Sequence, residues 1–61
     1  MDEKTKAFYD GAAQRTMKIG PYYAIGIIQA ACENTEETAA AKIENISYFL
    51  ERLLEEQGKE A

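Results

Sequence analysis

Thirteen residues in the middle of this chain, from Pro21 to Glu33, are apolar on nearly every side. Gln29 is the only strongly polar residue between Tyr22 and Cys32. The alanines and the length of the run favour a helix over a buried strand. Because a helix that is apolar all round must be covered on all sides, this segment constrains the fold more than any other.

Two short sequences divide the chain into three segments. Gly20-Pro21 suits the end of one helix followed by the first turn of the next. Asn34 can cap the following helix, with Glu37 placed three residues later as in a capping box, and Gly58 is expected to end that helix. We therefore predict an all-α, single-domain protein over residues 1–61, with a short N-terminal helix followed by an antiparallel helical hairpin. The expected helices are 3–18, 21–33 and 35–57.

The third segment has the clearest amphipathic pattern. Its apolar stripe recurs at alternating spacings of four and three residues: Ala39, Ile43, Ile46, Leu50, Leu53 and Gln57, with Phe49 and Leu54 beside it. We expect Asn45, Tyr48 and Arg52 on the opposite, polar side. The first segment has a weaker stripe, interrupted by Gly11: Phe8, Ala12, Thr16 and Ile19, with Tyr9, Ala13 and Met17 beside it.

The lengths of the two hairpin helices predict self-association. The third helix would be about 34 Å long and the second about 20 Å, which leaves roughly 14 Å of the third uncovered. Either the first helix continues past Gly20-Pro21 and runs alongside this end, or a second copy of the chain covers it. Two amphipathic neighbours also cannot enclose the apolar second helix. With one Cys and no His, the chain has neither an internal disulfide nor a zinc site to stabilise so small a core. We expect a homo-oligomer that completes a helical bundle through Ile25, Ile28, Leu50, Leu53 and Leu54.

The residue types argue against an enzyme. Cys32 is the single thiol, and without any His it lacks the usual base for nucleophilic catalysis, so we interpret it as a small buried hydrophobe. The sequence contains no glycine-rich phosphate loop and no calcium-loop spacing. We predict no catalytic residue, no metal and no cofactor.

Charge is distributed unevenly along the chain. Residues 1–32 carry four bases and three acids, whereas residues 33–61 carry three bases and eight acids, for a total net charge of -4. This balance disfavours direct binding to duplex nucleic acid. The longest weakly polar run, 19–32, is too short to span a membrane, and no apolar signal segment follows Met1. A cytoplasmic location without membrane contact is the expectation.

Two side-chain groups are candidates for binding. Cations beside aromatic rings can bind a phosphorylated or nucleotide-like ligand, which singles out Arg15, Lys18, Tyr22 and Tyr23. An aromatic side chain flanked by charge can anchor a protein partner, which singles out Tyr48, Arg52 and Glu55.

These observations leave three hypotheses for function. The first is a small non-enzymatic regulatory protein that acts as a homo-oligomer and binds another macromolecule, most simply a protein. The second is an oligomer that binds or sequesters a phosphorylated small ligand through the first of the two groups. The third is an acidic mimic that inhibits a nucleic-acid-binding protein through the acid-rich residues 33–61.

Overall fold

The computed structural model describes residues 1–60 and contains, over that range, three helices and no strand. They are α1 (Glu3–Ile19), α2 (Pro21–Glu33) and α3 (Ala39–Glu60). The all-α prediction is confirmed, and the ends of the first two helices agree with the predicted ones to within one residue.

Local side-chain and backbone chemistry fixes both ends of α1. Asp2 caps the N-terminus, because its carboxylate accepts a 2.7 Å hydrogen bond from the backbone N–H of Thr5. That bond holds the pKa of Asp2 below its usual value. At the other end Gly20 has a φ of 121°, and its N–H donates to the carbonyl of Thr16. Pro21 then opens α2, so the predicted boundary at Gly20-Pro21 is confirmed.

The start of α3 differs from the prediction. Asn34 and Glu37 do not cap the N-terminus of α3. Asn34 is instead the C-cap of α2, and its side chain accepts from the backbone N–H of Glu36 at 2.9 Å and forms a turn. Glu37 accepts hydrogen bonds from Asn34 and from Asn45, both at 3.0 Å, and so ties the turn to α3. Thr38 caps the helix by accepting from Ala41.

The far end of α3 also differs. Gly58 does not stop the helix, which continues to Glu60. No side chain or neighbouring element lies within 4 Å of the space that a Cβ at Gly58 would fill.

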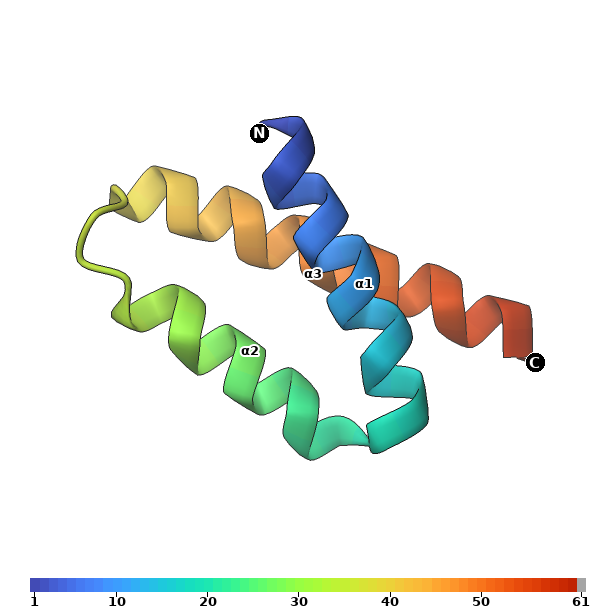
Figure 1. Ribbon diagram of the computed structural model, residues 1–61. Helices are drawn as coiled ribbons and strands as arrows, with labels where there is room; N and C mark the ends of the chain where they lie inside the picture. The colour runs from blue at the N-terminus through green and yellow to red at the C-terminus, as the bar shows by residue number, and fades with distance from the viewer. Residues whose placement is uncertain (61) are drawn as a thin grey trace.

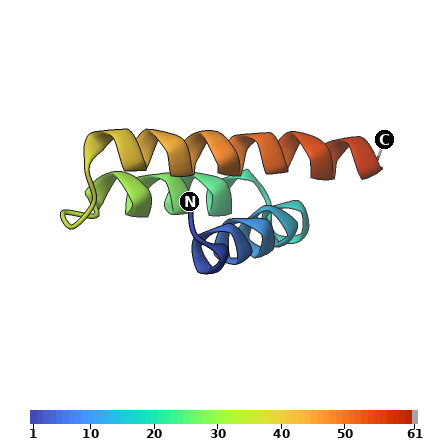
Figure 2. The same cartoon turned by 90° about the horizontal axis from the view of Figure 1, so that it is seen from above.

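Helices α2 and α3 lie side by side and antiparallel, and α1 crosses one side of this pair (Figures 1 and 2). Lys42 near the start of α3 donates to the carbonyl of Cys32 at the end of α2. At the opposite end, Pro21 and Leu53 line one cavity of about 340 Å³. Helix α3 starts later and ends later than expected, and it is still nine residues longer than α2 (22 against 13), so its C-terminal end extends beyond α2 (Figure 2). The length difference of about 14 Å agrees with the prediction.

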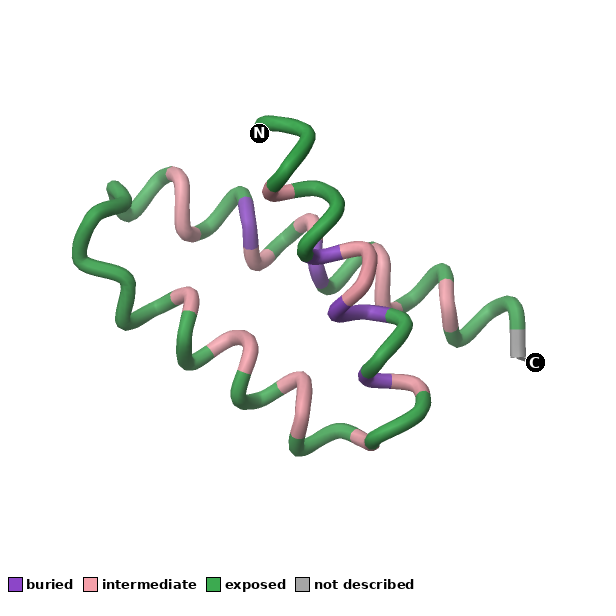
Figure 3. The backbone as a smooth tube through the Cα atoms, viewed as in Figure 1, coloured by how far each residue is buried: buried purple, intermediate pink, exposed green. Residues whose placement is uncertain are grey.

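The core lies where α1 crosses α3. Phe49 is fully buried there, together with Ala12 and Ala13, and its ring centroid is 5.8 Å from that of Tyr9. Small alanine side chains let the two helices approach closely. Figure 3 shows buried residues on α1 and α3 and none on α2.

Helix α2 contributes one side only to this core. Its half-buried residues pack against the buried cluster: Tyr23, Ala24, Ile27 and Ile28. The apolar composition of α2 predicts that it is covered on all sides. Within one chain, the side of α2 away from the buried cluster is exposed to solvent.

Candidate functional site

A polar cluster joins α1 to α3 beside the core. Asp10 of α1 accepts a 2.6 Å hydrogen bond from the Tyr48 hydroxyl and a 2.8 Å bond from Arg52 Nε. Arg52 also donates to Glu55 and Glu56. The expectation that Tyr48 and Arg52 face outward on the polar side of α3 is wrong, because α1 packs against this side and both residues are half-buried. Their proposed role as partner anchors stays a prediction.

The hydrogen bonds of the cluster stabilise ionised Asp10 and Glu56 and neutral Tyr48. The hydrogen bonds from Tyr48 and Arg52 hold the pKa of Asp10 below its usual value, and the same bond to Asp10 raises the pKa of Tyr48. The hydrogen bond from Lys59, followed by that from Arg52, lowers the pKa of Glu56. A general acid or base works best with a pKa near the working pH. The three shifts move these pKa values further from pH 7, so the cluster is poorly suited to proton transfer. It acts as a contact that holds α1 against α3.

Removing the charge of Asp10 should weaken the fold in a pH-dependent way. Because folding lowers the pKa of Asp10 below 3.8, its contribution is present above that pH and is lost as the pH falls through the lowered value. We expect Asp10→Asn to cost on the order of 1 kcal/mol at pH 7, a figure that allows for solvent screening of a side chain that is 40% exposed.

Urea unfolding of wild type and Asp10→Asn between pH 7 and pH 3 measures this contribution. The stability difference should narrow below pH 3.8. Glu51→Gln is the control, since no ion pair among the described residues involves Glu51. If the stability difference between wild type and Asp10→Asn stayed constant from pH 7 to pH 3, the charge of Asp10 would be ruled out as the source of the stabilisation.

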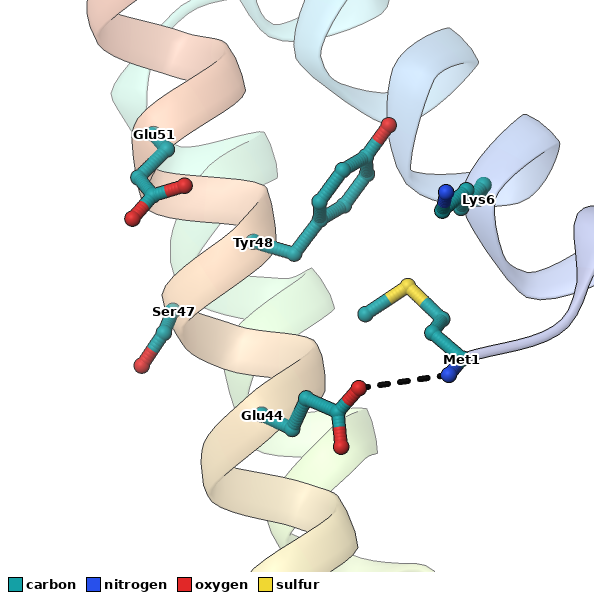
Figure 4. A pocket seen from close by; sticks show the side chains of 6 residues that line it. All are labelled: Met1, Lys6, Glu44, Ser47, Tyr48 and Glu51. Carbon is teal, nitrogen blue, oxygen red and sulfur yellow. Dashed lines mark hydrogen bonds and ion pairs between the residues drawn. The ribbon is translucent and has the colours of Figure 1, made fainter.

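The N-terminus lies in a groove between the same two helices. The α-amino group of Met1 is 3.2 Å from Oε1 of Glu44, and the Met1 side chain lies between Tyr48 and Glu44 (Figure 4). Lys6 and Glu51 complete the lining of this groove, together with Ser47. The groove thus serves to hold the first turn of α1 against α3.

The structure brings together two of the four residues predicted to bind a ligand. Arg15 Nε donates to the Tyr23 hydroxyl at 2.7 Å, and its guanidinium lies 5.8 Å from the centroid of that ring. Gly11 leaves room for this guanidinium, because a Cβ there would lie 3.0 Å from Arg15 Nη1. Tyr22 points into solvent with 87% of its surface exposed, and Lys18 is exposed at the end of α1. The ligand site as predicted is not assembled within one chain.

The side of the α2–α3 pair that faces away from α1 carries several exposed apolar residues. On α3, the exposed residues Ile43, Leu50 and Leu54 lie across the helix from Phe49 and Arg52, which contact α1, at 3.6 residues per turn. On α2, Ile25 is also half-exposed and lies across the helix from Tyr23. Together with the exposed Cys32 these residues form what we name the outer face: Ile25, Cys32, Ile43, Leu50 and Leu54.

The outer face contains three of the five residues predicted for self-association. Ile25, Leu50 and Leu54 belong to it, whereas Ile28 and Leu53 are half-buried and pack against the core. Leu50 and Leu54 are exposed because they lie on the side of α3 away from its contact with α1. The expectation that Cys32 is buried is wrong.

Acidic residues border the outer face along one edge. Glu44, Glu51 and Glu55 are exposed and lie about 100° around α3 from Ile43, Leu50 and Leu54. They are on the edge nearer to α1, where Glu44 pairs with Met1 and Glu55 with Arg52. Both rows run parallel to the axis of the helix. Glu51 is the one acid of this row that no ion pair among the described residues involves.

The described residues were searched for metal sites and membrane spans, and the chain was compared with known proteins. Among residues 1–60, no group of three or more acids and cysteines is placed to hold a metal ion. Over the same range, none of the helices has the length and apolar character needed to cross a membrane. No protein family, curated protein or solved structure matches this chain, so its function is inferred from the geometry of its own surfaces.

Proposed function

We propose that this chain is a non-enzymatic helical interaction protein that self-associates through the outer face and binds another macromolecule as a homo-oligomer. The observation that carries the proposal is the row of exposed aliphatic side chains on α2 and α3. Water contact with such a surface is unfavourable in proportion to its area. Contiguous exposed apolar patches of this kind mark interaction sites in soluble proteins.

The total surface supports the same proposal. The chain exposes 4371 Å², whereas a folded monomer of 6.8 kDa is expected to expose about 3,950 Å². The excess is roughly 400 Å², about half of the roughly 800 Å² that each partner contributes to a standard protein interface. A second copy on the outer face would remove this excess.

Sedimentation velocity on wild type and on a double variant tests the self-association. Leu50→Glu with Leu54→Glu places two more carboxylates on the outer face, and both positions are exposed in the monomer, so the fold should survive. We expect wild type to assemble across the micromolar range and the double variant to remain a monomer with unchanged helix content by circular dichroism.

A matched control separates a surface effect from a charge effect. Thr35→Glu adds a carboxylate at an exposed position of the α2–α3 turn, away from the outer face, and should assemble like wild type. A wild-type chain that stays monomeric throughout the micromolar range would overturn the proposal.

The other two hypotheses have less support from the geometry. The phosphate-ligand hypothesis is supported by the contact between Arg15 and Tyr23. Tyr22 is 87% exposed, and no hydrogen bond among the described residues joins it or Lys18 to that contact. The acidic-mimic hypothesis requires unpaired negative charge on residues 33–61. Part of that charge is already neutralised, because Glu44, Glu55 and Glu56 form ion pairs within the chain.

A further inference from the structure

A hollow of about 280 Å³ lies between the first half of α1, the α2–α3 turn and α3. It is separate from the groove that holds Met1 and shares no residue with the outer face. Pockets for drug-sized ligands measure about 300–1,000 Å³, so this hollow suits a smaller molecule. Six lining side chains offer a charge, a polar atom or an aromatic ring to such a molecule: Lys4, Phe8, Tyr9, Asn34, Glu37 and Asn45.

Two buried side chains present oxygen atoms to this hollow. Tyr9 and Asn45 are 7% and 6% exposed, and among the described residues neither the Tyr9 hydroxyl nor Asn45 Oδ1 has a hydrogen-bond partner. Every side-chain nitrogen or oxygen that is closed off from solvent in the described part of the chain does have a partner, so these two oxygens reach open space. The hollow is the space that both residues line. Buried polar groups are normally hydrogen-bonded, which leaves these two available to a bound molecule.

Glu37 adds a carboxylate that is held in place but has no cation as partner. Asn34 donates to one of its oxygens and Asn45 to the other, both at 3.0 Å, and no ion pair among the described residues involves Glu37. Burial, and after it the negative charge of Glu37, raise the pKa of Tyr9, so the hydroxyl stays protonated within the field of this carboxylate. A carboxylate fixed by two hydrogen bonds loses little freedom on binding. Together the three groups offer acceptors for the three N–H donors of an ammonium.

The α1 side of the hollow carries a cation and an exposed aromatic ring. Lys4 and Glu37 line the same hollow without forming an ion pair, so the two opposite charges face it separately. Phe8 is 51% exposed, and its ring meets that of Tyr9 edge to face with the centroids 5.1 Å apart. A simple amine would meet Lys4 as a like charge, and a simple carboxylate would meet Glu37 as one. A molecule with both charges avoids each of these repulsions.

We propose that this hollow binds a free α-amino acid. The ammonium of the ligand donates to the oxygens of Glu37, Asn45 and Tyr9. Its carboxylate pairs with Lys4, and an apolar side chain packs on the exposed ring of Phe8. This binding does not depend on self-association, because no residue of the outer face lines the hollow.

Three probes that share one aromatic ring test the chemistry of the ligand. L-Phenylalanine carries both charges, phenethylamine lacks the carboxylate and 3-phenylpropionate lacks the ammonium. Each is titrated at neutral pH and millimolar concentration into isotope-labelled wild type, and the amide chemical shifts are followed by NMR. We expect phenylalanine to shift the amides around the hollow and to bind roughly tenfold more tightly than either truncated probe, since each of these lacks one set of charge-assisted hydrogen bonds.

Two variants separate binding from folding. Tyr9→Phe keeps the ring that packs on Phe49 and removes only the hydroxyl, so the urea midpoint should stay unchanged while phenylalanine binds roughly fivefold more weakly, the loss expected for one neutral hydrogen bond. Tyr22→Phe is the matched control: it removes a hydroxyl from a side chain that is 87% exposed on α2 and should change neither. Lys4→Met should weaken the binding of phenylalanine and leave that of phenethylamine no weaker.

Several results would overturn the amino-acid site. If phenylalanine shifts no amide around the hollow, or shifts only amides elsewhere, the hollow is not the site. If 3-phenylpropionate binds as tightly as phenylalanine, the contact between the ammonium and Glu37 is wrong, and equal binding of phenethylamine refutes the contact between the carboxylate and Lys4. Unchanged binding by Tyr9→Phe removes the hydroxyl from the site. None of these results bears on self-association, which sedimentation measures separately.

Discussion

Replacing Phe49 by alanine is expected to remove most of the stability of this protein. Phe49 is the largest side chain that is fully buried, and it packs between α1 and α3 against Tyr9. Truncating a buried Phe to Ala costs about 3–5 kcal/mol. At roughly 0.05–0.15 kcal/mol per residue, a chain of 61 residues has a total stability of about 3–9 kcal/mol.

Urea unfolding monitored by circular dichroism measures this loss. Phe8→Ala is the matched control, because the same type of side chain is truncated at a position that is 51% exposed and touches the core only through the edge of the Tyr9 ring. We expect the control to cost less than about 1.5 kcal/mol. Equal losses for the two variants would mean that the core does not lie where α1 crosses α3.

Replacing Gly20 by alanine should destabilise the fold through the backbone alone. Gly20 has φ 121° and ψ 174°, a region that is essentially restricted to glycine and costs other residues about 1–3 kcal/mol. The space for a Cβ is open, since no atom lies within 4 Å of it. The loss of stability in Gly20→Ala therefore comes from the backbone conformation at the turn between α1 and α2. A clash of the new Cβ with a neighbouring element does not contribute.

The same substitution at Gly26 should have the opposite sign. Gly26 lies within α2, and a Cβ there also has no neighbour within 4 Å. Alanine in a helix is more favourable than glycine by about 1 kcal/mol, so Gly26→Ala should raise the midpoint of thermal unfolding while Gly20→Ala lowers it. A shift of the same sign in both variants would contradict the backbone angles at Gly20.

The helices that depend on local chemistry could be predicted from the sequence. Gly20 and Pro21 define the junction of α1 and α2 by their own backbone preferences, and the structure confirms it. The start of α3 could not be predicted in the same way. Asn34 can either cap a helix or close a turn, and the contact between Glu37 and Asn45 across the turn favours the second.

The exposed candidate site could be predicted only in part. The periodicity of α3 places Leu50 and Leu54 on its apolar stripe, and both are exposed in the structure. It cannot show which sector of the helix α1 will cover, since that depends on contacts between residues about forty positions apart, such as Asp10 with Tyr48 and Arg52. For this reason the sequence predicts Tyr48 on the solvent side of α3, whereas in the structure it lies at the contact between α3 and α1.

The sequence by itself determined that three helices form, that α2 is too apolar to stand alone, and that the acids gather in the second half of the chain. Only the tertiary structure decided which apolar side chains stay in solvent. Ala12 and Ala13 let α1 lie close over Phe49, and Asp10 holds it there. That crossing covers one side of the α2–α3 pair and leaves the other open, because a single helix of 17 residues can cover only one side.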